Sequence, residues 1–248
     1  MTTSITRFSD RVEDYIKYRP KYPQQIMEIL KNKIGFDNRQ IIADIGSGTG
    51  FSSEQFIFNG NIVFSVEPNK AMRKAAELIF KDYSNFISVD GSAEKSNLNG
   101  ESIDIIFSGQ AFHWFEKTKA KVEFKRILKQ NGHIVLAWNV RNEKNGFQKE
   151  YEQILKENIT EYQLVTHRNV SDKEINEFFL PKVLYKECLG NSQILDLEGL
   201  KGRLRSSSYC PKTGMKYEKL MKDVEDVFYK FVRNGQIKFE YETNIYWC

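Results

Sequence analysis

Short apolar runs and helical patterns alternate between residues 40 and 140. Runs rich in β-branched residues predict buried strands over residues 40–45, 61–66, 86–89, 102–108 and 133–138. The intervening segments predict helices ending near residue 58 and covering 70–80 and 117–129, with Asn69 as the N-cap of the second. Because strands that alternate with helices form βαβ units, we expect an α/β fold with a doubly wound, Rossmann-like parallel sheet.

The pattern changes after residue 139. Helices are predicted over 147–158, from a capping box at 171–174 to residue 179, and over 216–233, with two further strands over 183–189 and 236–247. The sequence contains no repeat and no linker rich in Pro or Ser. We therefore expect a single domain over residues 1–248 with a seven-stranded sheet. Residues 1–38 would form an N-terminal helical lid, residues 39–140 the cofactor-binding core, and residues 141–248 a helical cap plus the last strands. The helices of 143–180 would form a lid that excludes water from the site.

Composition narrows the class of protein. A hydrophobic share of 40% in 248 residues is ample for a packed core. The three cysteines are scattered and the three histidines dispersed, so we predict neither a disulfide framework nor a metal site. Residues 1–8 lack the apolar stretch of a secretory signal, and no apolar run is long enough to span a membrane. The expectation is a cytoplasmic protein without a membrane partner.

The net charge of +4 is mild, and its densest basic stretch covers residues 117–129. Two interpretations are open for this stretch, a surface for nucleic acid or an acidic partner, and the solvated face of an amphipathic helix. Apolar residues recur within it at helical spacing, and interleaved aromatic residues are missing. We favour the solvated face and predict no nucleic-acid partner.

A glycine-rich loop follows the first predicted strand and opens a helix, at residues 43–51. In a doubly wound sheet this is where a nucleotide-type ligand binds, and glycines let the backbone approach it closely. A dinucleotide fingerprint would require a third glycine or an alanine where Phe51 stands, and no Gly-Lys-Ser/Thr follows for a phosphate loop. These departures disfavour NAD-type and nucleoside-triphosphate ligands.

Polar residues also follow the second and third strands. Glu67 and Pro68 end the second, where a carboxylate can accept hydrogen bonds from both hydroxyls of a ribose. The segment from Asp90 through Ser92 and Ala93 to Glu94 follows the third and can read the edge of an adenine. Ribose recognition without a pyrophosphate loop fits an adenosine ligand such as S-adenosylmethionine (SAM).

These segments resemble those of class I SAM-dependent methyltransferases, and residues 126–132 resemble the turn that this family has before its fifth strand. Residues 15–23, 110–115 and 206–209 resemble the trans-aconitate methyltransferase-like branch, which includes small-acid methyltransferases. The resemblance implies that Tyr15 and Arg19 close over the cofactor, with Arg19 a partner of its carboxylate or, alternatively, a structural ion pair. The remaining expected cofactor contacts are Asp44, Gly46, Ser47, Gly48, Gly50 and Gln110.

The acceptor is expected at the end of the fourth strand, at residues 108–115. The Asn/Asp-Pro-Pro-Tyr-type motif of nucleic-acid amine methyltransferases is missing there. His113 is the candidate catalytic residue, either as a general base or as a structural neighbour of the cofactor. Trp114 is a candidate acceptor contact, with core packing as the alternative. If the acceptor is an acid, the candidates for binding it are Arg141, Arg203, Arg205 and Tyr209.

The sequence thus predicts an enzyme that transfers a methyl group from SAM to a small molecule, with a carboxylic acid as the favoured acceptor. An RNA or protein methyltransferase and a catalytically silent SAM-binding sensor remain alternatives. The sequence leaves monomer and homodimer equally open.

Overall fold

The structure is a computed structural model that describes residues 10–160, 162 and 170–248. Seven strands form a single sheet in the order β3-β2-β1-β4-β5-β7-β6. β1 to β5 pair in parallel, while β7 runs antiparallel to both β5 and β6. The strands are β1 (Ile42–Ile45), β2 (Val63–Val66), β3 (Phe86–Val89), β4 (Ile103–Gly109), β5 (Leu128–Arg141), β6 (Tyr185–Leu195) and β7 (Ile237–Trp247). The expected α/β fold with a doubly wound, Rossmann-like seven-stranded sheet is confirmed.

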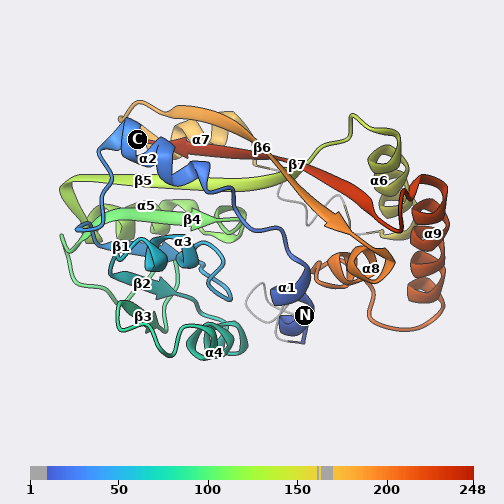
Figure 1. Cartoon of the computed structure of the whole chain (residues 1–248). Coiled ribbons are helices and arrows are strands. Elements are labelled where there is room, and N and C mark those ends of the chain that lie inside the picture. Colours follow the sequence, from blue (N-terminus) through green and yellow to red (C-terminus); the bar gives the residue numbers. More distant parts are fainter. Residues whose placement is uncertain (1–9, 161, 163–169) are drawn as a thin grey trace.

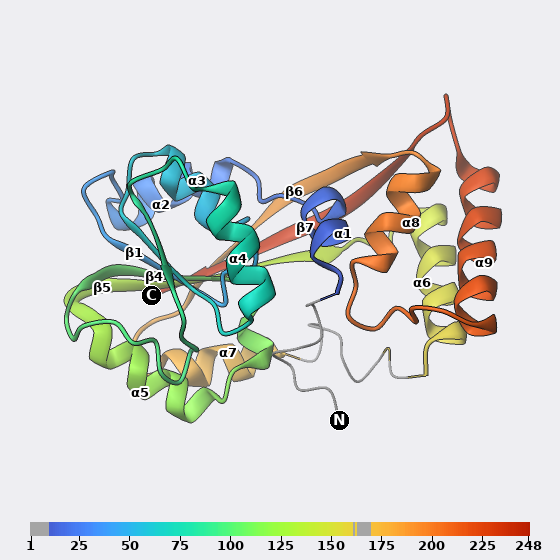
Figure 2. The same cartoon turned by 90° about the horizontal axis from the view of Figure 1, so that it is seen from below.

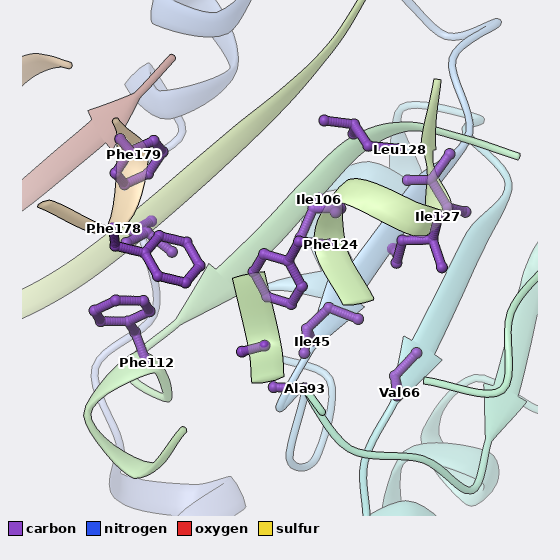
Figure 3. Close-up of a cluster of buried hydrophobic side chains, with 14 of the residues drawn as sticks. Ile45, Val66, Ala93, Ile106, Phe112, Phe124, Ile127, Leu128, Phe178 and Phe179 are labelled. Carbon is purple, nitrogen blue, oxygen red and sulfur yellow. The ribbon is translucent and has the colours of Figure 1, made fainter. Parts of the chain in front are cut away.

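Helices cover both faces of the core (Figures 1 and 2). One face packs on α2 (Gln25–Ile34), α3 (Ser53–Phe58) and α4 (Lys70–Ile79). The other face packs on α5 (Lys117–Ile127) and α7 (Asp172–Phe179), whose Phe124, Phe178 and Phe179 surround Phe112 and Ile106 in Figure 3. Because Phe178 and Phe179 are buried in this cluster, α7 is a core helix. The prediction that 143–180 form a lid is therefore wrong for α7. Residues 161 and 163–169 of that segment lie outside the described residues.

A third cluster builds the cap at the far end of the long strands (Figure 2). α6 (Gly146–Asn158), α8 (Leu197–Arg205) and α9 (Met215–Phe231) pack there on the ends of β6 and β7. α1 (Val12–Tyr18) lies beside α8, between the cap and the core (Figure 2). The N-terminal lid expected over residues 1–38 stays a prediction; within that segment α2 packs on the sheet and α1 lies beside α8. Residues 1–9 of that segment lie outside the described residues.

Several local predictions have a visible physical basis. The Asn69 side chain accepts hydrogen bonds from the backbone N–H groups of Ala71 and Met72, and Ser171 accepts one from Glu174. These contacts satisfy N–H groups that lack partners in the first turn of a helix.

The pairing of β4 with β5 is interrupted where a turn was expected. The register changes from Ile103–Leu128 to Ile105–His133, so residues 129–132 form a bulge. No helix among the described residues is long and apolar enough to cross a membrane.

Candidate active site

The glycine loop runs from the end of β1 to the start of α3. Gly46, Gly48 and Gly50 all adopt positive φ, at 72°, 59° and 86°. Residues with a side chain rarely adopt this conformation, which explains the three glycines. A Cβ atom at Gly46 would also lie 2.5 Å from Cβ of Ala111, so the loop needs a glycine there to meet the segment after β4.

Glu67 at the end of β2 is fixed by the same loop. Its carboxylate accepts hydrogen bonds from the backbone N–H of Gly48 at 2.9 Å and of Asn69 at 2.8 Å. Burial raises the pKa of Glu67, while these two N–H donors favour its ionised form. A carboxylate oxygen has more than one lone pair, so both oxygens can still accept the hydroxyls of a ribose.

A cavity of about 220 Å³ opens beside Glu67 and the glycine loop. Ten residues predicted for the cofactor or acceptor line it: Tyr15, Gly46, Gly48, Glu67, Pro68, Ser92, Ala93, Glu94, Gln110 and Trp114. Phe115, within the segment 108–115 expected at the acceptor, lines it too. Met72 also lines it and was not predicted, because an apolar residue on a helix carries no sequence signal of ligand binding. We call this space the cofactor cavity.

Asp90 is placed differently from the expectation. Its side chain is 74% exposed and forms an ion pair with Arg73 at 2.8 Å, and it does not line the cofactor cavity. The neighbouring Ser92, Ala93 and Glu94 provide the wall at which an adenine was expected. Asp90 therefore contributes to this wall through the loop it begins.

A smaller hollow continues from the cofactor cavity toward α1. It shares Tyr15, Gly46 and Gln110 with the cavity and adds Arg19 and Ser47. Gln110 has a positive φ of 56°, and its side-chain oxygen accepts a hydrogen bond from the backbone N–H of Asn139 at 3.0 Å. A non-glycine residue in this conformation is typical of a functional turn. Gly50 lines neither space; it permits the loop conformation, and a Cβ atom there would collide with the Phe80 ring.

Asp44 lies beneath the glycine loop and lines neither space. Its Oδ2 accepts hydrogen bonds from the hydroxyls of Ser52 and Ser53, each at 2.7 Å, whereas its buried Oδ1 has no hydrogen-bond partner in the described part of the chain. Burial raises the pKa of Asp44 to about 6, although the two serines oppose this shift. Asp44 thus fixes the start of α3 and carries an incompletely satisfied charge next to the site.

Arg19 is a buried cation at the end of α1. Its Nη2 donates to the backbone oxygen of Ser206 at 2.8 Å, and its buried Nε has no acceptor within the described residues. Burial, together with the nearby positive charge of Arg203, lowers the pKa of Arg19 to about 10. No carboxylate among the residues that the structure describes forms an ion pair with it. The alternative of a structural ion pair is therefore unsupported, and the site can accept an anion.

The candidate acid-binding arginines differ in their partners. Arg141 is buried and ion-paired with Glu152 at 3.0 Å, so its charge is already compensated. Arg203 is equally buried, but it donates hydrogen bonds to neutral groups, the hydroxyls of Tyr241 and Ser207, each at 3.1 Å. Arg205 points away, to Asp14 of α1 and Glu198 of α8, and joins the two helices. Of these three arginines, Arg203 is thus the one whose charge no carboxylate of the described residues compensates, and Arg205 has a structural role.

Tyr209 lies between the arginines. Its hydroxyl oxygen accepts a hydrogen bond from Nη1 of Arg141 at 3.0 Å. Burial raises the pKa of Tyr209, but Arg141 and Arg203 outweigh this effect, so its pKa lies below the ordinary value. The surroundings of Tyr209 therefore favour negative charge.

His113 and Trp114 form the short helix η2 (Phe112–Trp114) directly after β4. Their rings lie 4.7 Å apart, centroid to centroid, and Trp114 lines the cofactor cavity. Burial, with Lys117 and Arg19 nearby, lowers the pKa of His113 to about 3. The imidazole is therefore neutral at physiological pH and a weak base.

The chain is similar to known methyltransferases. Residues 43–136 match the family model described as a methyltransferase domain. An uncharacterized methyltransferase of Schizosaccharomyces pombe is 32% identical over 136 residues, which are 54% of this chain and 53% of the relative. One from Mycobacterium bovis is 28% identical over 148 residues, 60% and 58% of the two chains. The chain thus matches little more than half the length of these relatives.

Solved structures support the fold over nearly the whole chain. A candidate methyltransferase from an antibiotic biosynthesis pathway of Anabaena variabilis superposes with a TM-score of 0.65 at 21% identity, covering 94% of this chain and 98% of that one. A candidate type II methyltransferase from Anaeromyxobacter dehalogenans has the same TM-score at 16% identity, covering 93% and 97%. The fold and the matched domain are those of a class I methyltransferase, a class whose cofactor is SAM. Among the described residues, no group of three or more His, Cys, Asp or Glu is arranged to bind a metal.

Proposed function

We propose that this chain transfers a methyl group from SAM to a small-molecule acid. The observation that carries the cofactor half is the position of Glu67, whose carboxylate is fixed by the Gly48 N–H at the wall of the cofactor cavity. The observation that favours an acid is the buried guanidinium of Arg203, which donates to the hydroxyls of Tyr241 and Ser207 and has no carboxylate partner in the described chain. A buried, unpaired charge is costly, so such a cation is expected where a ligand brings the opposite charge.

The residues present fit the cofactor. Glu67 would accept the ribose hydroxyls, the loop from Ser92 to Glu94 would border the adenine, and Arg19 is positioned for the carboxylate of the methionine end. When bound, SAM supplies a methyl group on a sulfonium, which an acceptor oxygen takes as the carbon–sulfur bond breaks. The chain contributes alignment of the two reactants and exclusion of water.

The acceptor end requires little acid–base chemistry if the acceptor is a carboxylic acid. A carboxylate is already ionised at neutral pH, so no residue has to remove a proton before the methyl group is transferred. This agrees with the low basicity of His113, which makes it a poor general base. We assign His113 to the wall between cofactor and acceptor, with Tyr209 and Arg203 as the contacts of the acid.

The alternatives receive less support. Basic residues of the 117–129 stretch form ion pairs within the protein, as in Lys117 with Glu174, Arg126 with Glu123, and Lys129 with Asp104. This pairing favours the solvated-face interpretation over a surface for RNA or an acidic protein. A catalytically silent SAM-binding sensor has the same cofactor site, so only turnover separates it from an enzyme.

Calorimetric titration with S-adenosylhomocysteine, with NAD as the negative ligand, tests the cofactor half. We expect micromolar binding of S-adenosylhomocysteine that Glu67→Gln weakens at least tenfold, because an amide cannot accept from both Gly48 and Asn69 and from the ribose. Glu157→Gln, an exposed acid on α6, is the matched control. Radiolabelled methyl transfer from SAM to pools of small acids then tests the acceptor half. Binding of NAD instead would refute the cofactor assignment, and tight SAM binding without turnover on any pool would favour the sensor.

A further inference from the structure

The segment that connects α1 to α2, residues 19–24, forms neither a helix nor a strand (Figure 1). Pro20 and Tyr22 within it are buried, and it begins with Arg19, the proposed partner of the cofactor carboxylate. A buried backbone carbonyl needs a hydrogen-bond donor, and a segment outside helices and strands must find one elsewhere in the protein. The groups that hold this segment therefore determine where Arg19 lies.

Side-chain amides hold the segment by its backbone oxygens. Four residues from three elements donate to the carbonyl groups of residues 18–23: Gln193 and Asn191 of β6, Asn139 of β5 and Gln55 of α3. On one side of Arg19, Nε2 of Gln193 donates to the oxygen of Tyr18 at 3.1 Å. On the other side, Nδ2 of Asn191 donates to the oxygen of Lys21 at 2.8 Å. The edge strand β6 therefore holds the chain both before and after Arg19.

Asn191 makes the shortest of the contacts from the sheet and connects it to the hollow. The same Nδ2 donates to Oδ1 of Asn139 at 3.1 Å, and Asn139 lines the hollow together with Arg19. Asn139 itself reaches the oxygens of Pro20 and Lys21 only at 3.4 Å, beyond the about 2.7–3.2 Å of ordinary N–H···O hydrogen bonds. Asn191 lines neither the hollow nor the cofactor cavity, so any effect it has there passes through Lys21 and Asn139.

Loss of the Asn191 donor would leave the Lys21 oxygen with the long contact to Asn139. The segment that carries Arg19 would then sample more conformations, and a ligand that binds Arg19 would have to order it. A ligand that does not use Arg19 would bear no such cost. The effect of the loss thus depends on whether the ligand carries the carboxylate.

We propose that Asn191 is a positioning residue of the cofactor site, which makes the site prefer ligands that carry the methionine carboxylate. It holds the backbone that carries Arg19 and does not touch the ligand itself. This inference rests on the proposed function, since it requires Arg19 to bind that carboxylate.

Titration calorimetry with two ligands tests it: S-adenosylhomocysteine and 5′-methylthioadenosine, which has the same adenosine but lacks the amino-acid end. The variant is Asn191→Asp, whose carboxylate can still accept from the backbone N–H of Ser192 but cannot donate to Lys21. We expect it to weaken S-adenosylhomocysteine binding about three- to tenfold and to leave 5′-methylthioadenosine binding unchanged. Asn191→Ala, which introduces no charge, should give the same selective loss.

Ser192→Ala is the matched control, because Ser192 is exposed and its side chain lies on the opposite face of β6. It should alter neither affinity. Equal weakening of both ligands in the two Asn191 variants would show a general structural role and would overturn this inference. An unchanged affinity for S-adenosylhomocysteine in these variants would overturn it as well.

Arg19→Gln separates this inference from the proposed function. If Arg19→Gln removes the preference for S-adenosylhomocysteine and the Asn191 variants keep it, the role of Asn191 is refuted and the cofactor assignment stands. A preference that survives Arg19→Gln, or failure of S-adenosylhomocysteine to bind the wild-type protein, would instead overturn the cofactor contacts of the proposed function.

Discussion

Asp44 should make the protein less stable as the pH rises from about 4 to about 6. Its folded-state pKa of about 6 lies above its ordinary value of 3.8, because it is buried. The folded state therefore holds an extra proton in this window, and the free energy of unfolding decreases as that proton is lost. A difference of about two pKa units corresponds to about 3 kcal/mol, which is the order of the stability that ionised Asp44 costs at neutral pH.

Asp44→Asn removes this charge and keeps the size of the side chain. At pH 8 we expect the variant to be about 2 kcal/mol more stable than the wild type, somewhat less than the full electrostatic cost, because the amide accepts less strongly from Ser52 and Ser53. At pH 5, where the wild-type carboxyl is mostly protonated, the difference should shrink toward zero. Urea denaturation at both pH values measures it, with Asp82→Asn, an exposed acid, as the control. A variant that is destabilised equally at both pH values would refute the reasoning, since it would mean that ionised Asp44 is well satisfied.

The remaining predictions concern packing and a buried ion pair. Gly46→Ala should lower the melting temperature more than Gly35→Ala. Both glycines have positive φ, but a Cβ atom at 46 would lie 2.5 Å from Cβ of Ala111, whereas one at 35 would have nothing within 4 Å. Equal losses in thermal unfolding would contradict this. Glu152→Gln should destabilise the protein in denaturant unfolding, because it removes a carboxylate that forms a buried ion pair with Arg141, and breaking such a pair costs about 3–5 kcal/mol. A loss below about 1 kcal/mol would show that the pair is solvated.

Much of the core could be predicted because its determinants are local. Asn69 and Ser171 cap helices through contacts two or three residues away, so the signal lies within one turn of sequence. The same holds for the glycine loop, whose conformation depends on residues 46, 48 and 50 themselves. Glu67 could be placed because the carboxyl ends of neighbouring parallel strands meet at one edge of a sheet.

The features that were missed depend on contacts between distant residues. α8 was not predicted because Gly199 and Gly202 lower its helical propensity. Gly202 is explained only by the structure, where a Cβ atom would collide with the Tyr18 ring of α1. Likewise, Arg203 and Arg205 stand two residues apart with the same charge, yet Arg205 finds Asp14 and Arg203 finds only hydroxyls. Sequence spacing alone carries no information about which of them is compensated.

The contact between α1 and α8 gives the cofactor and the acceptor a shared boundary. Arg19 lines the hollow next to the glycine loop and donates to the Ser206 backbone, three residues before Tyr209. Arg11 donates to the backbone oxygens of Arg205 and Cys210 on either side of that segment. A ligand carboxylate that binds Arg19 would therefore alter its hydrogen bond to the Ser206 backbone oxygen, and with it the position of the segment that carries Tyr209.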